Sequence, residues 1–236
     1  SRQLGSDVST FYKKKAYKDL VAKAKRTIRV HYSETEHDMD YSSHNYKAAN
    51  RERNIRAPIK IEYAYAENQI FDDYLKDLAI VQDFAQVNRR SIEEVILEGM
   101  GLHRIDGFDS VHNYIDTESM ILRKGAVSAR LGERLIVPLN MRDGALICTG
   151  LGNAEWNFSS PHGAGRACSR TDARHAYTVE VFKEKMQGIY STTISADTLD
   201  ECPMAYKAVD RITPLLAQTA TIVEVVRPIY NFKAGQ

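Results

Sequence analysis

A single histidine lies between a proline and a glycine turn in the stretch from Ser159 to Arg170. The segment is Pro161, His162, Gly163, Ala164 and Gly165, followed by Arg166 and, later, Arg170. Its small residues leave the backbone uncovered beside the imidazole, so phosphate groups can approach main-chain N–H groups closely. The two arginines are four positions apart, so on a helix they share one face and can bind phosphate oxygens. An imidazole in such a place can attack phosphorus. The same residues also fit a glycine turn that opens a helix at Ser169, with His162 a solvated turn residue.

Two further polar clusters precede this stretch in the sequence. His112-Asn113-Tyr114 places an imidazole and a carboxamide on a predicted strand, where they suit a metal ion and a phosphate respectively. Taken alone, such a histidine is more often a satisfied core residue. Arg123-Lys124-Gly125-Ala126 places two cations at a strand end ahead of a glycine turn, where an anion can be bound. An ordinary polar strand end has the same composition.

Length and composition indicate a globular protein. The chain has 236 residues, 43% of them hydrophobic, which is enough for a buried core in a single domain spanning 1–236. Its three cysteines form no C-x-x-C pair, so we expect no disulfide framework and a reducing compartment, by default the cytoplasm. No apolar run reaches membrane-spanning length, and we expect no membrane association. Ser1 stands where an initiator methionine would, so we expect a processed or cut chain.

Charge is unevenly distributed, although the net charge is only +1. Eight cations crowd residues 13–29 around a single acid, and we interpret them as a solvated helix face. A near-neutral chain does not by itself indicate nucleic-acid binding. His31, His37 and His44 recur among acids, but no helical or hairpin register aligns them, so we interpret them as surface histidines rather than metal ligands.

Apolar spacing predicts two long helices in the first part of the chain, from Gly5 to about Arg29 and from Asn68 to about Gly99. Asn68 is the predicted N-cap of the second, and glycines at its end supply the stop. The polar segment from His31 to about Pro58 predicts an exposed loop or insertion.

The rest of the chain predicts a grouped sheet followed by alternating elements. Strands are expected at Ser110–Ile115, Ser119–Lys124, Arg134–Pro138, Leu146–Thr149, Ile189–Ile194 and Thr221–Phe232, and helices at Thr178–Gln187 and from about Met204 to Ala217. Long helices beside a grouped sheet indicate an α+β fold with a mixed or antiparallel sheet, because a regular βαβ repeat is lacking.

The order of these motifs resembles the RtcB-type RNA-splicing ligases over nearly the whole chain. The matching blocks are His112-Asn113-Tyr114, Arg123 to Ala129, Pro138 with Met141, Gly150-x-Gly152-Asn153 and His162-Gly163-Ala164-Gly165-Arg166-x-x-Ser169-Arg170. Supporting stretches are Phe71 to Leu75, Pro203 to Lys207 and Phe232-Lys233. The match is weakest between His31 and Pro58.

This resemblance implies a specific reaction. Such ligases join RNA ends bearing a 2′,3′-cyclic phosphate or 3′-phosphate to 5′-hydroxyl ends, using GTP and Mn²⁺. By resemblance, His162 attacks the α-phosphorus of GTP and becomes guanylylated, and the GMP then passes to the RNA 3′-phosphate. His112 would be a Mn²⁺ ligand and Asn113 a phosphate contact. The nucleotide would be held by Asn140, Met141, Gly163, Ala164, Gly165, Tyr206 and Lys233, and RNA by Arg123, Lys124, Arg166 and Arg170.

The sequence departs from the family pattern in two places. Pro138-Leu139-Asn140-Met141-Arg142-Asp143-Gly144 stands where many members have a Pro-Gly-Ser-Met-Gly turn, which indicates a divergent branch. Ser1 to Gly5 resembles the tail of a His-Ser-Gly-Ser-Arg motif. The other metal ligands of the family lie upstream of that motif, so we expect this chain to be the C-terminal part of a ligase whose N-terminal metal-binding half is elsewhere.

Two functions follow as hypotheses. One is the GTP- and Mn²⁺-dependent RNA ligase itself, and the other is a truncated, non-catalytic relative that binds nucleotide or RNA. The sequence leaves open the RNA substrate, tRNA exons or damaged ends, and the need for an activator of the archease type.

Overall fold

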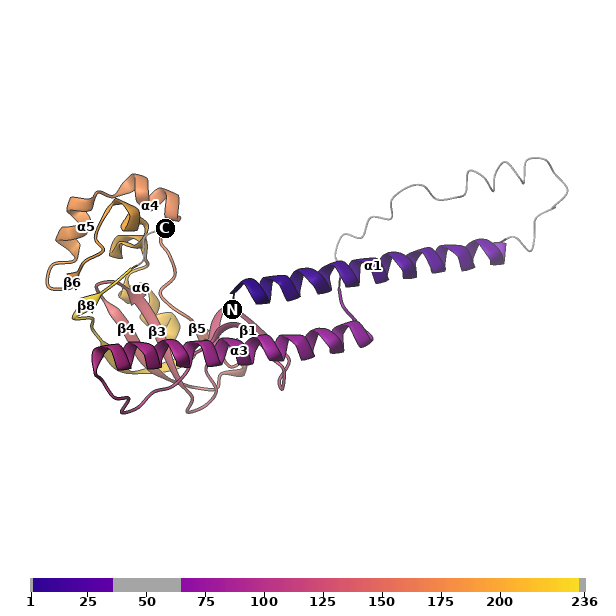
Figure 1. Cartoon of the computed structure of the whole chain (residues 1–236), viewed down its shortest axis with the longest axis horizontal. Coiled ribbons are helices and arrows are strands. Elements are labelled where there is room, and N and C mark those ends of the chain that lie inside the picture. Colours follow the sequence, from indigo (N-terminus) through magenta and orange to yellow (C-terminus); the bar gives the residue numbers. More distant parts are fainter. Residues whose placement is uncertain (1, 36–64, 234–236) are drawn as a thin grey trace. The chain divides into compact units, whose positions relative to one another are not determined.

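A computed structural model describes residues 2–35 and 65–233 (Figure 1). The contacts within the chain divide it into two compact units, Ser1–His103 and Arg104–Gln236. We describe each unit by itself, and the single domain expected from the sequence stays a prediction.

The first unit is a pair of long antiparallel helices, α1 (Arg2–Thr35) and α3 (Asn68–Met100). One face of α1 repeats every four residues and buries Tyr12, Ala16 and Leu20. The Tyr12 hydroxyl donates to Asp77 at 2.7 Å across the pair. Both predicted helices are therefore confirmed. Helix α1 continues to Thr35, so the loop predicted from His31 was wrong for its first residues, and the rest of that loop, with His37 and His44, lies outside the described residues.

The N-terminus of α3 differs from the sequence-based prediction. Asn68 is the first helical residue rather than the N-cap, and its φ is 52°. Glu67 occupies the cap position and makes no side-chain cap hydrogen bond. At the other end, Gly101 adopts the left-handed conformation and its N–H reaches back to the carbonyl of Glu98, which confirms the predicted glycine stop.

The second unit contains two antiparallel three-stranded sheets and one short parallel pair. One sheet has the order β1 (His112–Asp116), β2 (Ile121–Ser128), β5 (Ser159–Pro161). The other has the order β3 (Arg134–Asn140), β4 (Gly144–Gly150), β7 (Ala220–Val226). The pair is β6 (Tyr190–Ser191) with β8 (Tyr230–Asn231). The four grouped strands thus belong to two sheets rather than one, and the long strand predicted at Thr221–Phe232 is broken in two.

Helical segments complete the second unit. They are α4 (Arg170–Ala176), α5 (Val179–Lys185), α6 (Val209–Leu216) and the 3-10 turns Ala154–Trp156, Ala196–Glu201 and Pro203–Ala205. Ser169 accepts a hydrogen bond from the N–H of Asp172, as expected of a helix opening there. Long helices with antiparallel sheets confirm the α+β class. No helix within residues 2–35 and 65–233 combines the length and apolar character needed to cross a bilayer.

Two buried clusters form the core of this unit. Strand alternation drives Leu135, Val137 and Leu146 into the first cluster, which Leu216 of α6 covers. The second cluster centres on Phe182 of α5. Tyr206 is half-buried and packs against both clusters, so its ring is fixed where the two meet. All three cysteines, Cys148, Cys168 and Cys202, are free thiols.

Candidate functional site

The imidazole of His162 is held by a backbone carbonyl. Strand β5 pairs with β2, matching Pro161 to Ala126, and His162 follows directly after Pro161. Its Nδ1 lies 2.6 Å from the carbonyl oxygen of Gly125. Since a carbonyl oxygen can only accept, Nδ1 carries the hydrogen and donates it. In the neutral ring, Nε2 then keeps its lone pair and is the atom that can attack or ligate.

A second imidazole lies beside the first. Strand β1 matches His112 to Val127, the β2 residue whose other neighbour is Ser160. This register brings the rings of His112 and His162 together, with centroids 4.9 Å apart and planes inclined by 40°. The structure thus joins two histidines that the sequence analysis treated as separate motifs.

Asn113 occupies an irregularity in the β1–β2 pairing. Its φ is 59°, and its Oδ1 accepts from the Gly125 N–H at 2.7 Å. The carboxamide predicted to contact phosphate therefore holds the same glycine whose carbonyl orients His162. Its side chain is exposed, and its NH₂ group points to no hydrogen-bond acceptor among the contacts of the described residues.

The loop after His162 is anchored on both sides. The Ala164 N–H donates to the Pro138 carbonyl at 2.9 Å, and the Gly165 carbonyl accepts from the Lys207 N–H at 3.0 Å. Ala164 is buried, so its N–H is committed to the protein rather than to a ligand. Gly165 is exposed and has a φ of 69°, which favours glycine. The resemblance implies that Gly163, Ala164 and Gly165 hold the nucleotide, and of these three Gly165 has the most accessible backbone.

The divergent turn at 138–144 is closed by its own side chains. Asn140 accepts from the N–H groups of Arg142 and Asp143 at 3.0 and 2.9 Å, and donates to the Asp143 carboxylate at 2.8 Å. Met141 is 2% exposed and packs in the second core cluster. The structure therefore gives Asn140 and Met141 structural partners in the places where the resemblance implied nucleotide contacts.

Arg123 and Lys124 face in opposite directions, as neighbours on a strand must. Arg123 is 1% exposed and donates to Ser159 Oγ at 2.9 Å, to the Tyr114 hydroxyl at 3.0 Å and to the carbonyl oxygens of Asn157 and Phe158 at 3.4 Å. Its guanidinium is hydrogen-bonded within the protein and buried, so the structure does not support the predicted contact between Arg123 and RNA. Lys124 is exposed.

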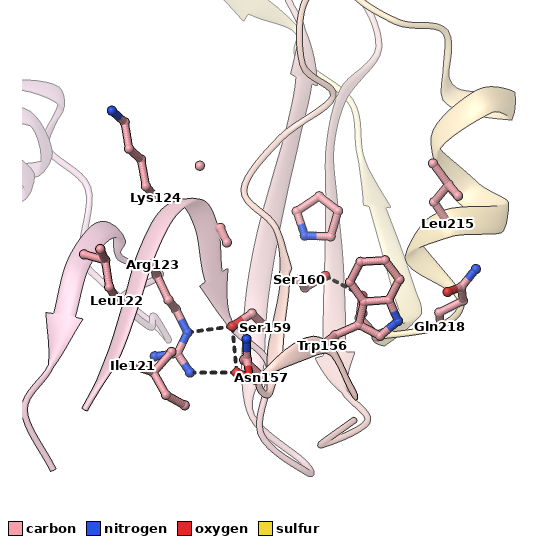
Figure 2. Close-up of a pocket in the computed structure, with 14 residues that line it drawn as sticks. Ile121, Leu122, Arg123, Lys124, Trp156, Asn157, Ser159, Ser160, Leu215 and Gln218 are labelled. Atoms are coloured by element: carbon pink, nitrogen blue, oxygen red, sulfur yellow. Dashed lines mark hydrogen bonds between the residues drawn. The ribbon is translucent and has the colours of Figure 1, made fainter. Parts of the chain in front are cut away.

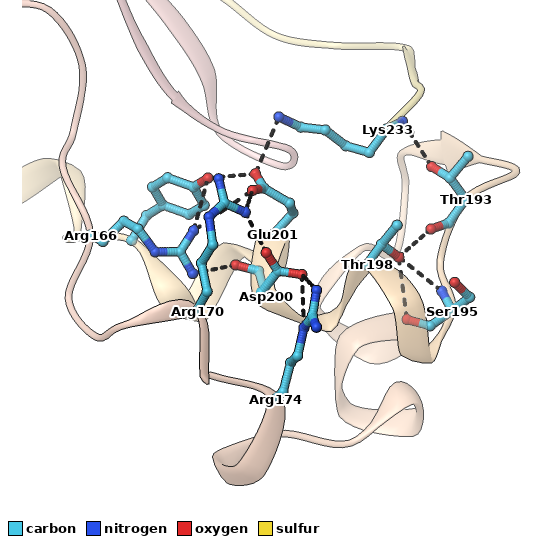
Figure 3. Close-up of polar contacts among 10 residues, drawn as sticks. Arg166, Arg170, Arg174, Thr193, Ser195, Thr198, Asp200, Glu201 and Lys233 are labelled. Carbon is cyan, nitrogen blue, oxygen red and sulfur yellow. Dashed lines mark hydrogen bonds and ion pairs between the residues drawn. The ribbon is translucent and has the colours of Figure 1, made fainter. Parts of the chain in front are cut away.

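Four cations from Arg166, Arg170, Arg174 and Lys233 gather around the carboxylates of Asp200 and Glu201 (Figure 3). Asp200 is 1% exposed and is bound by Arg170 and Arg174, the latter at 3.1 Å. Glu201 is bound by Arg170, by Lys233 at 3.2 Å and by the Tyr206 hydroxyl at 2.6 Å. Arg166 donates to the backbone carbonyl of Asp200.

This cluster shifts the protonation equilibria of its acidic groups. Burial alone raises the pKa of Glu201, but the Tyr206 hydrogen bond and the charges of Lys233 and Arg170 bring its pKa below the ordinary value. Burial also opposes ionisation of Asp200, and Arg170 and Arg174 again lower its pKa. Desolvation, with the Glu201 hydrogen bond second, raises the pKa of Tyr206 to about 12. The phenol is therefore a neutral hydrogen-bond donor, and both carboxylates are ionised at neutral pH.

The sequence placed Tyr206 and Lys233 at the nucleotide and Arg166 and Arg170 at RNA, whereas the structure brings all four together around two acids that the sequence did not indicate. Asp200 and Glu201 lie in a 3-10 turn between Leu199 and Cys202, and both flanking side chains are buried. Two adjacent acids in a short apolar segment are a signal that such a pair is buried against cations. The arginine partners of Asp200 lie 26 to 34 positions away, a relationship that sequence spacing does not reveal.

A pocket of about 440 Å³ adjoins the His162 loop (Figure 2). Its lining includes Gly125 and Pro161, which are next to His162, and also Trp156, Leu215 and Gln218. Trp156 was missed in the sequence, where its being the single tryptophan was the signal that could have found it. Its 53% exposure is visible only in the structure.

The described residues do not assemble a complete metal site. Within residues 2–35 and 65–233, no group of three or more histidine, cysteine, aspartate or glutamate side chains is placed to hold a metal ion. His112 and His162 supply two imidazoles at most. Mn²⁺ favours sites that include carboxylates, so this donor set does not fit it unaided.

Taken together, the described residues supply an imidazole with a defined tautomer, an exposed glycine three positions after it and a basic cluster. Such groups can take part in nucleotidyl or phosphoryl transfer through a side-chain nucleophile. The chain belongs to the RtcB family, because the family model described as tRNA-splicing ligase RtcB matches residues 1–234. The resemblance seen in the sequence is thereby confirmed.

Curated relatives agree with this assignment. The chain is 33% identical over 183 residues to the RNA-splicing ligase RtcB of Escherichia coli strain K12, covering 70% of this chain and 44% of the relative. It is 29% identical over 212 residues to the tRNA-splicing ligase RtcB of Nanoarchaeum equitans, covering 72% of this chain and 44% of the relative. The chain thus spans less than half the length of these relatives.

Proposed function

We propose that this chain carries the nucleophile and part of the nucleotide and RNA site of an RNA ligase that uses GTP and Mn²⁺. The ligase joins an RNA 3′-phosphate or 2′,3′-cyclic phosphate end to a 5′-hydroxyl end, through a guanylylated His162. The observation that carries the proposal is the hydrogen bond from His162 Nδ1 to the Gly125 carbonyl, because it leaves Nε2 as the free nucleophilic atom.

The first step forms a phosphorus–nitrogen bond. The lone pair of His162 Nε2 attacks the α-phosphorus of GTP, and the bond from that phosphorus to the bridging oxygen breaks with pyrophosphate as the leaving group. The ring gains positive charge while Nδ1 keeps its proton. The Gly125 carbonyl, 2.6 Å from Nδ1, stabilises that charge.

The later steps transfer and then release GMP. A 2′,3′-cyclic phosphate end first takes up water, which breaks the bond from phosphorus to the 2′-oxygen and leaves a 3′-phosphate and a 2′-hydroxyl. An oxygen of the RNA 3′-phosphate then attacks the phosphorus on His162, which restores the neutral imidazole. The 5′-hydroxyl of the second RNA end then attacks the activated 3′-phosphorus, loses its proton and displaces GMP. Arg166, Arg170 and Lys233 keep net positive charge around Asp200 and Glu201, which suits a site for anionic RNA and nucleotide.

The metal requires ligands beyond those that the described residues bring together. We propose His112 as the ligand that this chain supplies, with Mn²⁺ neutralising phosphate charge when bound. The remaining ligands are expected from the part of the relatives that this chain does not span. RNA ends, GTP and that part are the proposed partners, and an archease-type activator is a further one for assays to examine.

The test uses the protein as it is made in its own cells, tagged at its own gene so that any further segment or subunit is retained. Labelled GTP with Mn²⁺ is expected to leave an adduct that is labile in acid and stable in base, as a histidine phosphoramidate is. His162→Ala should abolish the adduct, and His175→Ala, an exposed histidine in α4, should retain it. An undiminished adduct in His162→Ala would remove His162 from the nucleophile role. Binding of RNA without any adduct in the unaltered protein would favour the non-catalytic relative.

A further inference from the structure

The pocket adjoins the proposed nucleophile. Its lining includes Gly125, whose carbonyl holds His162, Pro161, which precedes His162 in the sequence, and Lys124. Trp156, Leu215 and Gln218 also line it, and Figure 2 shows the indole on the side of Gln218 and Leu215, with Lys124 on the other side of the view. The lining of one pocket therefore includes residues next to His162 and an exposed aromatic ring.

The 3-10 turn that carries Trp156 is anchored by hydrogen bonds of Asn153. Asn153 caps the turn by accepting from the Glu155 N–H at 3.0 Å, and its NH₂ group donates to the Gln218 carbonyl at 2.9 Å. This residue ties the turn to the end of α6. Trp156 itself is 53% exposed, so it is not part of the buried core and its ring is accessible.

The backbone after Trp156 is unusual. Asn157 and Phe158 have φ values of 49° and 51°, and neither is glycine. Such left-handed residues persist when the surroundings hold them, and they gather at ligand sites. Here the buried Arg123 donates to both of their carbonyl oxygens at 3.4 Å. Arg123 therefore braces the turn that presents the indole.

We infer that this pocket binds an unpaired nucleotide of the RNA strand whose end reacts at His162. The inference rests on the proposed function and adds the place where the RNA lies. The nucleobase stacks on the Trp156 indole, the Gln218 amide is available to its polar edge, and a neighbouring phosphate meets the Lys124 ammonium.

Three observations select this occupant. The pocket volume of about 440 Å³ is in the range of roughly 300–1,000 Å³ that small-ligand sites occupy, enough for one nucleotide. Tyr206 and Lys233, where the resemblance places guanine, are not among the residues that line it, so the pocket is separate from the proposed GTP site. The lining also combines an exposed indole with an exposed ammonium, that of Lys124, and aromatic rings with cations bind single-stranded nucleic acid irrespective of sequence.

Trp156 is the only tryptophan of the chain, so its emission reports on the pocket directly. We expect a short single-stranded RNA with a 3′-phosphate to quench the emission of the 236-residue chain as it saturates. Trp156→Ala should weaken RNA binding, measured by anisotropy of a labelled RNA, by about 5- to 100-fold, the equivalent of about 1–3 kcal/mol of base stacking. Trp156→Phe should recover most of that affinity, because an aromatic face is restored.

Control variants separate stacking from general effects. Tyr190→Ala removes an aromatic ring that is 67% exposed on β6 and does not line the pocket, and it should leave RNA affinity unchanged. Lys124→Gln should lower the slope of log affinity against log salt by about one, whereas Lys183→Gln on α5 should not.

These measurements test RNA binding in the pocket separately from the formation of the His162 adduct. Equal RNA affinity in Trp156→Ala and the unaltered chain, or RNA binding without any change in emission, would overturn the inference while leaving the ligase proposal intact. Quenching by GTP alone would instead assign the pocket to the nucleotide and overturn it as well. Absence of any adduct in the unaltered protein from its own cells would refute the ligase proposal and would leave the measured RNA contact standing.

Discussion

His162 and Gly125 are joined by a 2.6 Å hydrogen bond although 37 positions separate them in the sequence. Gly125 is itself held by Asn113, whose Oδ1 accepts from its N–H at 2.7 Å. The orientation of the proposed nucleophile is therefore set by a main-chain carbonyl on the neighbouring strand, and that carbonyl depends on a glycine with a φ of 69°.

Replacing this glycine is expected to reduce guanylylation more than it reduces stability. In Gly125→Ala, the new Cβ would lie 3.6 Å from His162 Cε1, and the positive φ would be strained by about 1–2 kcal/mol. Relaxation of that strain shifts the carbonyl, and we expect adduct formation with labelled GTP to fall roughly 10- to 100-fold, as a small misplacement of reacting groups can cause.

Gly132 offers a matched control for this change. Its φ is 78° and a Cβ there would meet no atom within 4 Å, so Gly132→Ala carries the same backbone strain away from His162. Thermal unfolding should be lowered similarly in both variants, while only Gly125→Ala should lose adduct. Equal adduct formation in the two would show that the carbonyl of Gly125 does not orient the nucleophile.

Arg123→Met is expected to destabilise the fold strongly. The substitution removes a buried guanidinium that donates to Asp116 and to the carbonyl oxygens of Asn157 and Phe158. Because Asp116 keeps its ion pair with Arg130 at 2.8 Å, we expect a cost of about 3 kcal/mol. The neighbouring Lys124→Met, on the exposed face of the same strand, should change stability by less than about 0.5 kcal/mol. Denaturant unfolding of the two variants checks this, and similar midpoints would contradict the structural role of Arg123.

Which of the adjacent cations Arg123 and Lys124 is buried could be predicted from the sequence only in part. Adjacent cations look alike in a sequence, and strand alternation says only that they face opposite sides. Arg123 and Val127 are an even number of positions apart on the same strand, so their side chains point to the same side of the sheet. Because Val127 is buried, this spacing could have indicated that Arg123 faces the interior. Both long helices could be predicted, although the apolar repeat is much clearer in α3 than in α1, where only Tyr12, Ala16 and Leu20 are buried among the residues whose side chains are described.

Strand pairing was harder to predict than strand existence. Strand β5 is three residues long, Ser159–Pro161, and has no apolar alternation. Yet its pairing with β2 is what brings His162 to Gly125. Pairing depends on contacts between segments distant in the chain, which local patterns do not contain.

The cluster around Asp200 and Glu201 predicts a defined dependence of stability on pH. Both carboxyl groups have a folded-state pKa below the ordinary values of 3.8 and 4.5. Their ionised forms therefore stabilise the fold above those ordinary values, and this contribution is lost as the pH falls through the lowered folded-state pKa. We expect the thermal midpoint to fall steadily below about pH 4.5.

Neutral variants isolate this contribution. Asp200→Asn removes the charge that Arg170 and Arg174 contact and should cost about 1–3 kcal/mol at pH 7, as for hydrogen bonds to a charged group. With Glu201→Gln added, the thermal midpoint should become flatter between pH 3 and 5. The control Asp197→Asn, an exposed acid of the same turn, should leave the profile unchanged. An unaltered slope in the double variant would mean that other acids govern the acid transition.

The last prediction concerns His112, whose ring centroid lies 4.9 Å from that of His162. Two roles fit this placement: His112 ligates Mn²⁺, or it packs against the His162 ring and positions it. In the protein from its own cells, the ligand role predicts that His112→Ala lowers both Mn²⁺ affinity and adduct formation. We expect the loss of affinity to be roughly 10-fold or more, since changes outside the ligand set alone cost about 10- to 100-fold. The positioning role predicts lost adduct with unchanged Mn²⁺ affinity. His175→Ala, in the last turn of α4, controls for loss of an exposed imidazole.

Because the described residues place no group of three metal-ligating side chains, the 236-residue polypeptide by itself should bind Mn²⁺ weakly and form no adduct. Robust labelling of that polypeptide, verified by intact mass, would show that the metal site is built from its own residues, and His31, His37 and His44 would then be the first to replace.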